Sequence, residues 1–157
     1  PLDAALDTMP EGWVPESIVD IGGGTGRAAY HLAARYPDAE VTVIDLAPKM
    51  LAVGKARADR ENLPRVEFVA GDSTAMPLLT DIADLAYVLN APPNVAELRR
   101  VLRPGGVVVF AFTWGHHTPM YLDDETSRRV LEREGFEDIR AGHGGEGTFT
   151  IARLPDE

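Results

Sequence analysis

Residues Val19-Asp20-Ile21-Gly22-Gly23-Gly24-Thr25-Gly26 stand where an apolar, strand-like run gives way to a helical pattern. Glycines let the backbone turn with positive φ and let a ligand come close to the main chain, while the free amides at a helix start favour a carboxylate or phosphate. A purely structural turn is the alternative, but four glycines in five positions would weaken the fold for no gain in packing. The stretch therefore predicts a site for an anionic cofactor group.

Apolar runs alternate with helical patterns after this stretch, which is typical of a parallel sheet covered on both faces. The expected strands are Ser17–Ile21, Val41–Asp45, Val66–Ala70, Ala83–Leu89 and Gly106–Thr113. The expected crossover helices are Arg27–Arg35, Lys49–Arg60 and Val95–Leu102. Pro104-Gly105-Gly106 stops the last of these helices and turns the chain into the fifth strand.

The pattern changes after the fifth strand. Asp123–Glu134 is expected to be helical, and Phe136–Ala141 and Gly147–Leu154 are expected to pair as a closing hairpin across the glycine-rich Gly142–Gly147. The whole chain thus predicts an α/β fold with a doubly wound, Rossmann-like, mostly parallel seven-stranded sheet and an antiparallel C-terminal edge strand. We expect a single domain over residues 1–157 with a short N-terminal segment, 1–16.

Composition excludes several classes of function. Of the 157 residues, 45% are hydrophobic, which suffices for one core, and 15 basic against 25 acidic side chains give a net charge of −10. This charge disfavours nucleic acid as a partner, and the arginines within Arg99–Arg103 are interpreted as a solvated helix face. The absence of cysteine excludes disulfides, thiolate zinc sites and cysteine nucleophiles. No apolar run approaches the roughly 20 residues of a membrane span, so we expect a cytoplasmic protein with no membrane partner.

The glycine-rich stretch does not by itself identify the cofactor. Gly24-Thr25-Gly26-Arg27-Ala28-Ala29 also fits the G-x-G-x-x-A form of the dinucleotide fingerprint. Asp45 ends the second expected strand, where a carboxylate accepts hydrogen bonds from ribose hydroxyls in either cofactor class. These residues predict a nucleoside cofactor, and a nicotinamide dinucleotide-binding oxidoreductase fragment stays open as an alternative.

Further motifs between Ser17 and Thr113 separate the two cofactor classes. In chain order they are Asp20 with Gly22, Gly24 and Gly26, then Val43-Ile44-Asp45-Leu46, Gly71-Asp72-Ser73, Asp84-Leu85-Ala86-Tyr87-Val88 and Leu98–Gly106. In this order and at this spacing the chain resembles the class I S-adenosylmethionine-dependent methyltransferases. The resemblance implies S-adenosyl-L-methionine as the cofactor and a small-molecule methyl acceptor.

The resemblance also implies roles for the residues that follow the strands. The methionine carboxylate of the cofactor would meet the glycine-loop amides, Asp45 would hold the ribose, and Leu46 would cover the adenine. Asp72, with Ser73 beside it, would bind the adenine amino group. Two alternatives stay open, because Asp20 either contacts the cofactor or ties the loop amides together, and Asp72 is either a ligand contact or an ordinary turn aspartate.

The loops after the fourth and fifth strands are the expected acceptor side. Asn90-Ala91-Pro92-Pro93-Asn94 resembles the N-P-P-aromatic loop of amino-methylating enzymes, but the inserted alanine and missing aromatic favour an ordinary Pro-Pro helix start. Asn90 itself is expected to contact the methionine portion of the cofactor. His116 and His117, which follow Trp114, are the candidate catalytic bases, with simple solvent exposure as the alternative. No metal site is expected from their spacing.

Only Pro1–Glu16 precedes the first expected strand, whereas the family that the chain resembles usually carries more helix there. The site could therefore be open, completed by a second subunit of a homodimer, or closed by residues beyond this sequence.

Methyl transfer from a sulfonium depends mainly on proximity, orientation and exclusion of water, so a dedicated base is optional. A non-catalytic S-adenosylmethionine-binding module is thus a third hypothesis.

Overall fold

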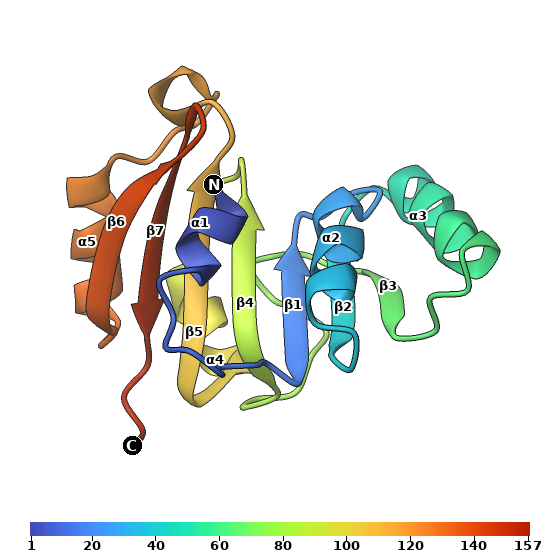
Figure 1. Ribbon diagram of the computed structural model, residues 1–157, viewed down its shortest axis with the longest axis horizontal. Helices are drawn as coiled ribbons and strands as arrows, with labels where there is room; N and C mark the ends of the chain where they lie inside the picture. The colour runs from blue at the N-terminus through green and yellow to red at the C-terminus, as the bar shows by residue number, and fades with distance from the viewer.

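The computed structural model describes every residue of the chain, 1–157 (Figure 1). Its strands are β1 (Ser17–Ile21), β2 (Glu40–Asp45), β3 (Val66–Ala70), β4 (Ala83–Leu89), β5 (Leu102–Phe112), β6 (Glu137–Gly144) and β7 (Gly147–Arg153). Its helices are α1 (Leu2–Leu6), α2 (Arg27–Arg35), α3 (Pro48–Arg60), α4 (Val95–Val101), α5 (Asp124–Arg133) and the short 3-10 helix η1 (Gly115–His117). None of these helices combines the length and apolar character needed to cross a lipid bilayer.

All seven strands form one sheet in the order β3-β2-β1-β4-β5-β7-β6. The first five pair in parallel, whereas β7 is antiparallel to both β5 and β6. The predicted mostly parallel, seven-stranded fold is confirmed, and the antiparallel C-terminal strand lies one place in from the edge that β6 forms. Strand order reverses between β1 and β4, which is the place where open α/β sheets bind ligands.

Two apolar layers hold the helices against the two faces of the sheet. Along β1, Ile18 contributes to the layer beneath α1, α2 and α3, while the next residue, Val19, contributes to the layer beneath α4 and α5. This alternation follows from the two-residue period of a strand. Because both faces are covered, β1 is buried along nearly its whole length and fixes where the glycine stretch emerges.

The N-terminal segment contains a helix that the sequence patterns did not predict. In α1, Leu2 and Leu6 are buried, and the helix packs against β5, β6 and β7. Two ion pairs also attach it to α2, because Arg35 donates to Asp3 and to Asp7 at 2.8 Å each. A five-residue helix is too short to form alone, so these tertiary contacts stabilise it.

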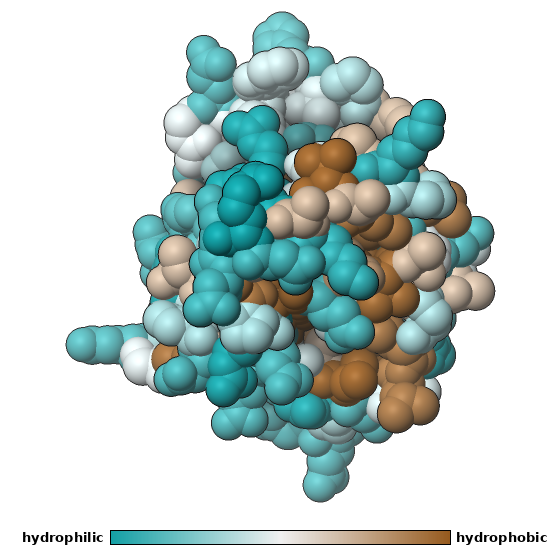
Figure 2. Space-filling view, turned by 90° about the vertical axis from the view of Figure 1, so that its right-hand side faces the viewer, coloured by the Kyte–Doolittle hydropathy of each residue, from teal (hydrophilic) through white to brown (hydrophobic).

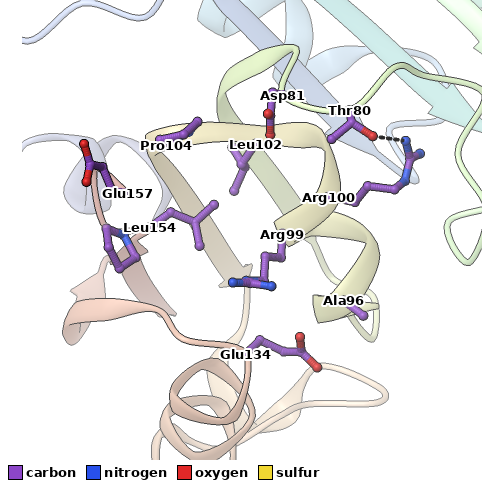
Figure 3. A pocket seen from close by; sticks show the side chains of 11 residues that line it. Thr80, Asp81, Ala96, Arg99, Arg100, Leu102, Pro104, Glu134, Leu154 and Glu157 are labelled. Carbon is purple, nitrogen blue, oxygen red and sulfur yellow. Dashed lines mark hydrogen bonds between the residues drawn. The ribbon is translucent and has the colours of Figure 1, made fainter.

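Arg100 is a structural clamp, and its interpretation as part of a solvated face was wrong. Its guanidinium donates to the main-chain oxygens of Leu78 at 2.8 Å and Met76 at 3.0 Å and to Glu97 Oε1 at 2.7 Å. These bonds hold the chain between β3 and β4 against α4. Figure 3 shows Arg100 turned towards Thr80 and the neighbouring Arg99 directed into a cavity of about 500 Å³.

We expect Arg100→Ala to lower the free energy of unfolding by about 2 kcal/mol, because several charge-assisted hydrogen bonds to the main chain are lost together. Arg99→Ala is the matched control, since Arg99 is exposed and should change stability by no more than about 0.5 kcal/mol. Urea unfolding of both variants measures the difference. Equal values would mean that Arg100 does not clamp the segment between β3 and β4.

Candidate functional site

The glycine stretch forms a tight loop between β1 and α2. Gly22, Gly24 and Gly26 all have positive φ, at 72°, 57° and 83°. Gly26 has a second constraint, because a Cβ there would lie 2.7 Å from the ring of Phe68. The loop therefore depends on backbone conformations and close packing that residues other than glycine would strain, and no side chain caps the first amides of α2.

A hollow of about 620 Å³ opens beside this loop. Its wall includes the backbone of Gly22–Thr25, the buried Asp20 and, across the switch point, Asn90. Sequence reasoning missed the other polar residues that line it, namely Arg27, His31, Thr113 and, from α1, Asp3. Arg27 and His31 could have been indicated by their position on the helix that follows the loop. No sequence signal indicated Thr113 or Asp3. The cavity of Figure 3 lies at the opposite edge of the sheet, around the start of β5.

Asp20 lies in the wall of the hollow with only 1% of its surface exposed. Both carboxyl oxygens lack a hydrogen-bond partner, so Asp20 does not tie the loop amides together as one alternative proposed. The loop instead packs on the carboxyl, since a Cβ on Gly23 would lie 2.3 Å from one oxygen. Burial raises the pKa of Asp20 to about 7; the Tyr87 hydroxyl opposes this rise and the Asp45 charge adds to it.

Asp45 makes the loop contact that was considered for Asp20. One carboxylate oxygen accepts from the amide of Gly24 and the other from the amide of Ala47, both at 2.8 Å. The side chain thereby joins the end of β2 to the glycine loop. It stays partly exposed, so it keeps lone pairs for a further partner.

Apolar surface surrounds Asp45 at the α3 end of the sheet. Leu46 is 69% exposed, and Met50 and Val53 on α3 are also exposed. Figure 2, which views the molecule from this end, shows apolar side chains gathered over part of the surface. A flat apolar ligand next to Asp45 would cover this region.

Asp72 and Ser73 follow β3 at the same edge of the sheet. Asp72 Oδ1 accepts from the amide and the hydroxyl of Thr74, at 2.8 Å and 2.7 Å, and these bonds lower its pKa. This geometry matches the ordinary turn aspartate of the sequence analysis, while the exposed second oxygen is free for a ligand. Neither residue lines the hollow itself, and the same holds for Gly26, Asp45 and Leu46.

Asn90 connects the ends of the two central strands. Its side-chain oxygen accepts from the amide of Thr113 at 2.8 Å, and its amide donates to the Thr113 hydroxyl at 2.9 Å. Its φ of 59° is strained for a residue with a side chain, although Asn tolerates it better than most.

Asn94 caps α4 by accepting from the amide of Glu97, which confirms the helix-start interpretation of the preceding prolines.

A second hollow, of about 600 Å³, lies where η1 meets the β6–β7 hairpin. His116 and His117 are both exposed there, with their ring centroids 3.9 Å apart, beside Trp114, which is 60% exposed. The hairpin adds His143, which sequence reasoning missed because only strand pairing brings it to this edge. The structure contains no group of three or more His, Cys, Asp or Glu side chains that could hold a metal ion.

The raised pKa of Asp20 predicts a pH-dependent stability. The unfolded chain loses the Asp20 proton near the usual 3.8 and the folded protein near 7, so the free energy of unfolding falls across this window. We expect a loss of about 4 kcal/mol between about pH 4 and pH 8 that Asp20→Asn, which cannot titrate, does not show. Urea unfolding of both proteins over this range is the measurement. Parallel curves would contradict the raised pKa.

Comparison with known proteins agrees with this geometry. A family model described as a methyltransferase domain matches residues 18–106. Over 99 residues the chain is 38% identical to a ubiquinone/menaquinone biosynthesis C-methyltransferase of Paracoccus denitrificans, covering 58% of this chain and 40% of that protein. Over 110 residues it is 37% identical to a malonyl-acyl-carrier-protein O-methyltransferase of Laribacter hongkongensis, covering 62% and 37%. The chain therefore spans about two fifths of the length of these relatives.

The fold is also similar to that of a solved structure. A phosphoethanolamine N-methyltransferase of Haemonchus contortus, solved with S-adenosyl-L-methionine, superposes with a TM-score of 0.80 over 97% of this chain and 51% of that one. At 18% identity this likeness shows the fold alone. The matched region of the family model is more than half of the chain and includes the glycine loop, Asp20, Asp45 and Asn90. On this basis the chain belongs to the methyltransferase domain family.

Proposed function

We propose that this domain binds S-adenosyl-L-methionine beside the glycine loop and transfers its methyl group to a small-molecule acceptor. The observation that carries the proposal is the buried carboxyl of Asp20, which has no hydrogen-bond partner and lies in the wall of a hollow bounded by the loop backbone. A buried polar group without a partner is rare in folded proteins and suggests an absent ligand. Membership of the methyltransferase domain family supports the choice of cofactor.

The residues around the hollow fit the chemical parts of this cofactor. The loop amides would bind the methionine carboxylate, and Asp20 with Asn90 would contact the rest of the methionine portion. Asp45, which retains free lone pairs, would accept from the ribose hydroxyls. The exposed Leu46 would cover the adenine, and Asp72 with Ser73 would bind its amino group. When bound, the cofactor supplies an electrophilic methyl group on a sulfonium.

The chain itself contributes orientation and exclusion of water. The two hydrogen bonds between Asn90 and Thr113 fix the ends of β4 and β5, between the glycine loop and the second hollow. We propose that the acceptor lies in that second hollow, against the exposed ring of Trp114. His116 or His117 could take a proton from an acceptor that must lose one.

The acceptor itself cannot be carried over from the relatives. One is named for quinone biosynthesis and methylates carbon, and the other is named for an acyl carrier protein and methylates oxygen. The match covers only 40% and 37% of their own lengths, so both relatives extend well beyond this domain. The homodimer, the cytoplasmic location and the exclusion of nucleic acid stay predictions from the sequence.

A panel of cofactors tests the cofactor class. We expect S-adenosylmethionine and S-adenosylhomocysteine to raise the melting temperature and NAD and NADP to leave it unchanged, because a ligand selective for the native state stabilises it.

Asp45→Ala should weaken binding of S-adenosylhomocysteine by about 2–4 kcal/mol, the scale for losing a charged hydrogen-bond partner. Thermal shift and calorimetry are the measurements.

Three outcomes would contradict different parts of the proposal. A shift with NAD alone would favour the oxidoreductase alternative. Unchanged affinity in a folded Asp45→Ala protein would mean that another residue holds the ribose. Tight cofactor binding without turnover of any small phenol, carboxylate or amine would favour the non-catalytic binding module.

Substitution of the histidines tests the acceptor side. We expect His116→Ala and His117→Ala to slow single-turnover methyl transfer and to alter its pH profile, with cofactor affinity unchanged, because neither residue lines the cofactor hollow. The matched control is cofactor affinity measured by calorimetry on the same samples. Wild-type rates in both variants would remove the histidines from the mechanism and leave catalysis to proximity.

A further inference from the structure

The turn of the β6–β7 hairpin carries a carboxylate that forms no ion pair within the protein. β6 and β7 pair as far as Gly144 and Gly147, so Gly145 and Glu146 alone form the turn. Gly145 has a φ of 61°, which suits a turn of this length and which glycine adopts without strain. Glu146 therefore lies at the tip of the hairpin, exposed and outside all the ion pairs of the chain.

This turn packs against η1, although the two segments are distant in the chain. A Cβ on Gly115 of η1 would lie 3.2 Å from Thr148 Cγ2 and 3.3 Å from the main-chain oxygen of Glu146. Thr148 in turn pairs with Phe112 at the end of β5. Close packing at Gly115 thus fixes the backbone of Glu146 beside the second hollow, in whose lining it takes part.

The charges around the second hollow favour a cationic ligand. Its lining contains Glu146 and three histidines but no lysine or arginine. Glu146 is therefore the one residue of the lining that carries a charge near neutral pH without first taking up a proton. The net charge of −10 on the whole chain also attracts cations and repels anions.

The uncharged part of the lining suits an ammonium group as well. Trp114 is 60% exposed, and the face of an indole attracts a cation that lies over it. His116 and His117 belong to the same lining, and a neutral imidazole can take the proton that an ammonium group must lose before its nitrogen can react. A neutral alcohol would gain little from Glu146, and a carboxylate would be repelled by it.

We propose that the second hollow selects an amine as the methyl acceptor, which binds as an ammonium ion to the carboxylate of Glu146 and the indole of Trp114. This inference rests on the proposed function, because it names the acceptor class of the same reaction. The two hollows are close enough to serve one reaction, since Thr113 lines the first and its neighbour Trp114 lines the second.

The reaction balances with the groups already named. An imidazole of His116 or His117 takes one proton from the ammonium group. The amine nitrogen then forms a bond to the methyl carbon while the carbon–sulfur bond of the sulfonium breaks, and the electron pair of that bond stays on sulfur. The products are a methylated ammonium ion and a neutral thioether, and the imidazolium returns its proton to solvent.

Two sets of probes that differ in their end group test the acceptor class. They are phenethylamine, 2-phenylethanol and 3-phenylpropanoate, and hexylamine, hexanol and hexanoate. In protein saturated with S-adenosylhomocysteine at about pH 8, we expect the amine of each set to bind about tenfold more tightly than its alcohol or carboxylate. Ligand-observed NMR titration measures binding, and single-turnover transfer from S-adenosylmethionine should methylate the amines alone.

The outcomes separate this inference from the proposed function. If S-adenosylhomocysteine does not bind, the proposed function fails. If the cofactor binds and the amines show no preference, or methyl transfer reaches the alcohol or carboxylate instead, the acceptor class is wrong and cofactor binding stands. Binding of the amines without their methylation would overturn their role as acceptors.

Substitution of Glu146 tests the carboxylate. Glu146→Gln should weaken phenethylamine binding about fivefold and leave 2-phenylethanol unchanged, because an exposed ion pair is lost, whereas Glu146→Asp should keep the preference for the amine. Glu134→Gln is the matched control, since it makes the same change in net charge at the cavity of Figure 3, at the opposite edge of the sheet. Equal losses in Glu146→Gln and Glu134→Gln, or no loss in Glu146→Gln, would remove Glu146 from the site.

Trp114→Leu tests the indole separately, because it keeps an apolar side chain and removes the aromatic face. Binding of phenethylamine should weaken about threefold more than binding of 2-phenylethanol, which has the same ring and no charge. Equal weakening of the two probes would mean that Trp114 contacts the ring and not the ammonium group, which would overturn its part in selecting the amine.

Discussion

The parallel pairing of β1 with β2 on one side and β4 on the other is the constraint on which the site depends. It brings three strand ends to one edge, so that Asp20, Asp45 and Asn90 approach the same glycine loop although they are far apart in the chain. The helices that follow β1 and β4 lie on opposite faces of the sheet, which leaves the edge between them open. Without this reversal the loop would have no opposite wall.

Several features at this edge of the sheet cost the fold stability. Three glycines of the loop have positive φ, Asn90 has a strained φ of 59°, and Asp20 is buried without a partner. Each feature would be removed by selection for stability alone, so their clustering at one edge indicates a site. The well-packed strands on both sides supply the stability that this edge gives up.

The two hollows of the molecule lie in differently matched parts of the chain. The hollow beside the glycine loop is lined mostly by residues within the region that the family model matches, with additions from α1 and from Thr113. The second hollow, where we propose that the acceptor lies, is formed by η1 and the β6–β7 hairpin, which lie beyond that region. On this proposal, changes in the loops after the fifth strand would change the acceptor without changing the cofactor hollow.

Sequence alone determined the fold class, because strands that are buried on both faces read as continuous apolar runs and glycines mark the turn after β1. It also placed Asp45, Asp72 and Asn90 at strand ends, where the structure has them. Tertiary structure decided what local patterns do not encode: the short helix α1 exists only through its contacts, and Arg100 became a clamp. The pairing of Asp20 with Tyr87 is of the same kind, because strand register, set by packing between residues distant in the chain, places the two buried groups together.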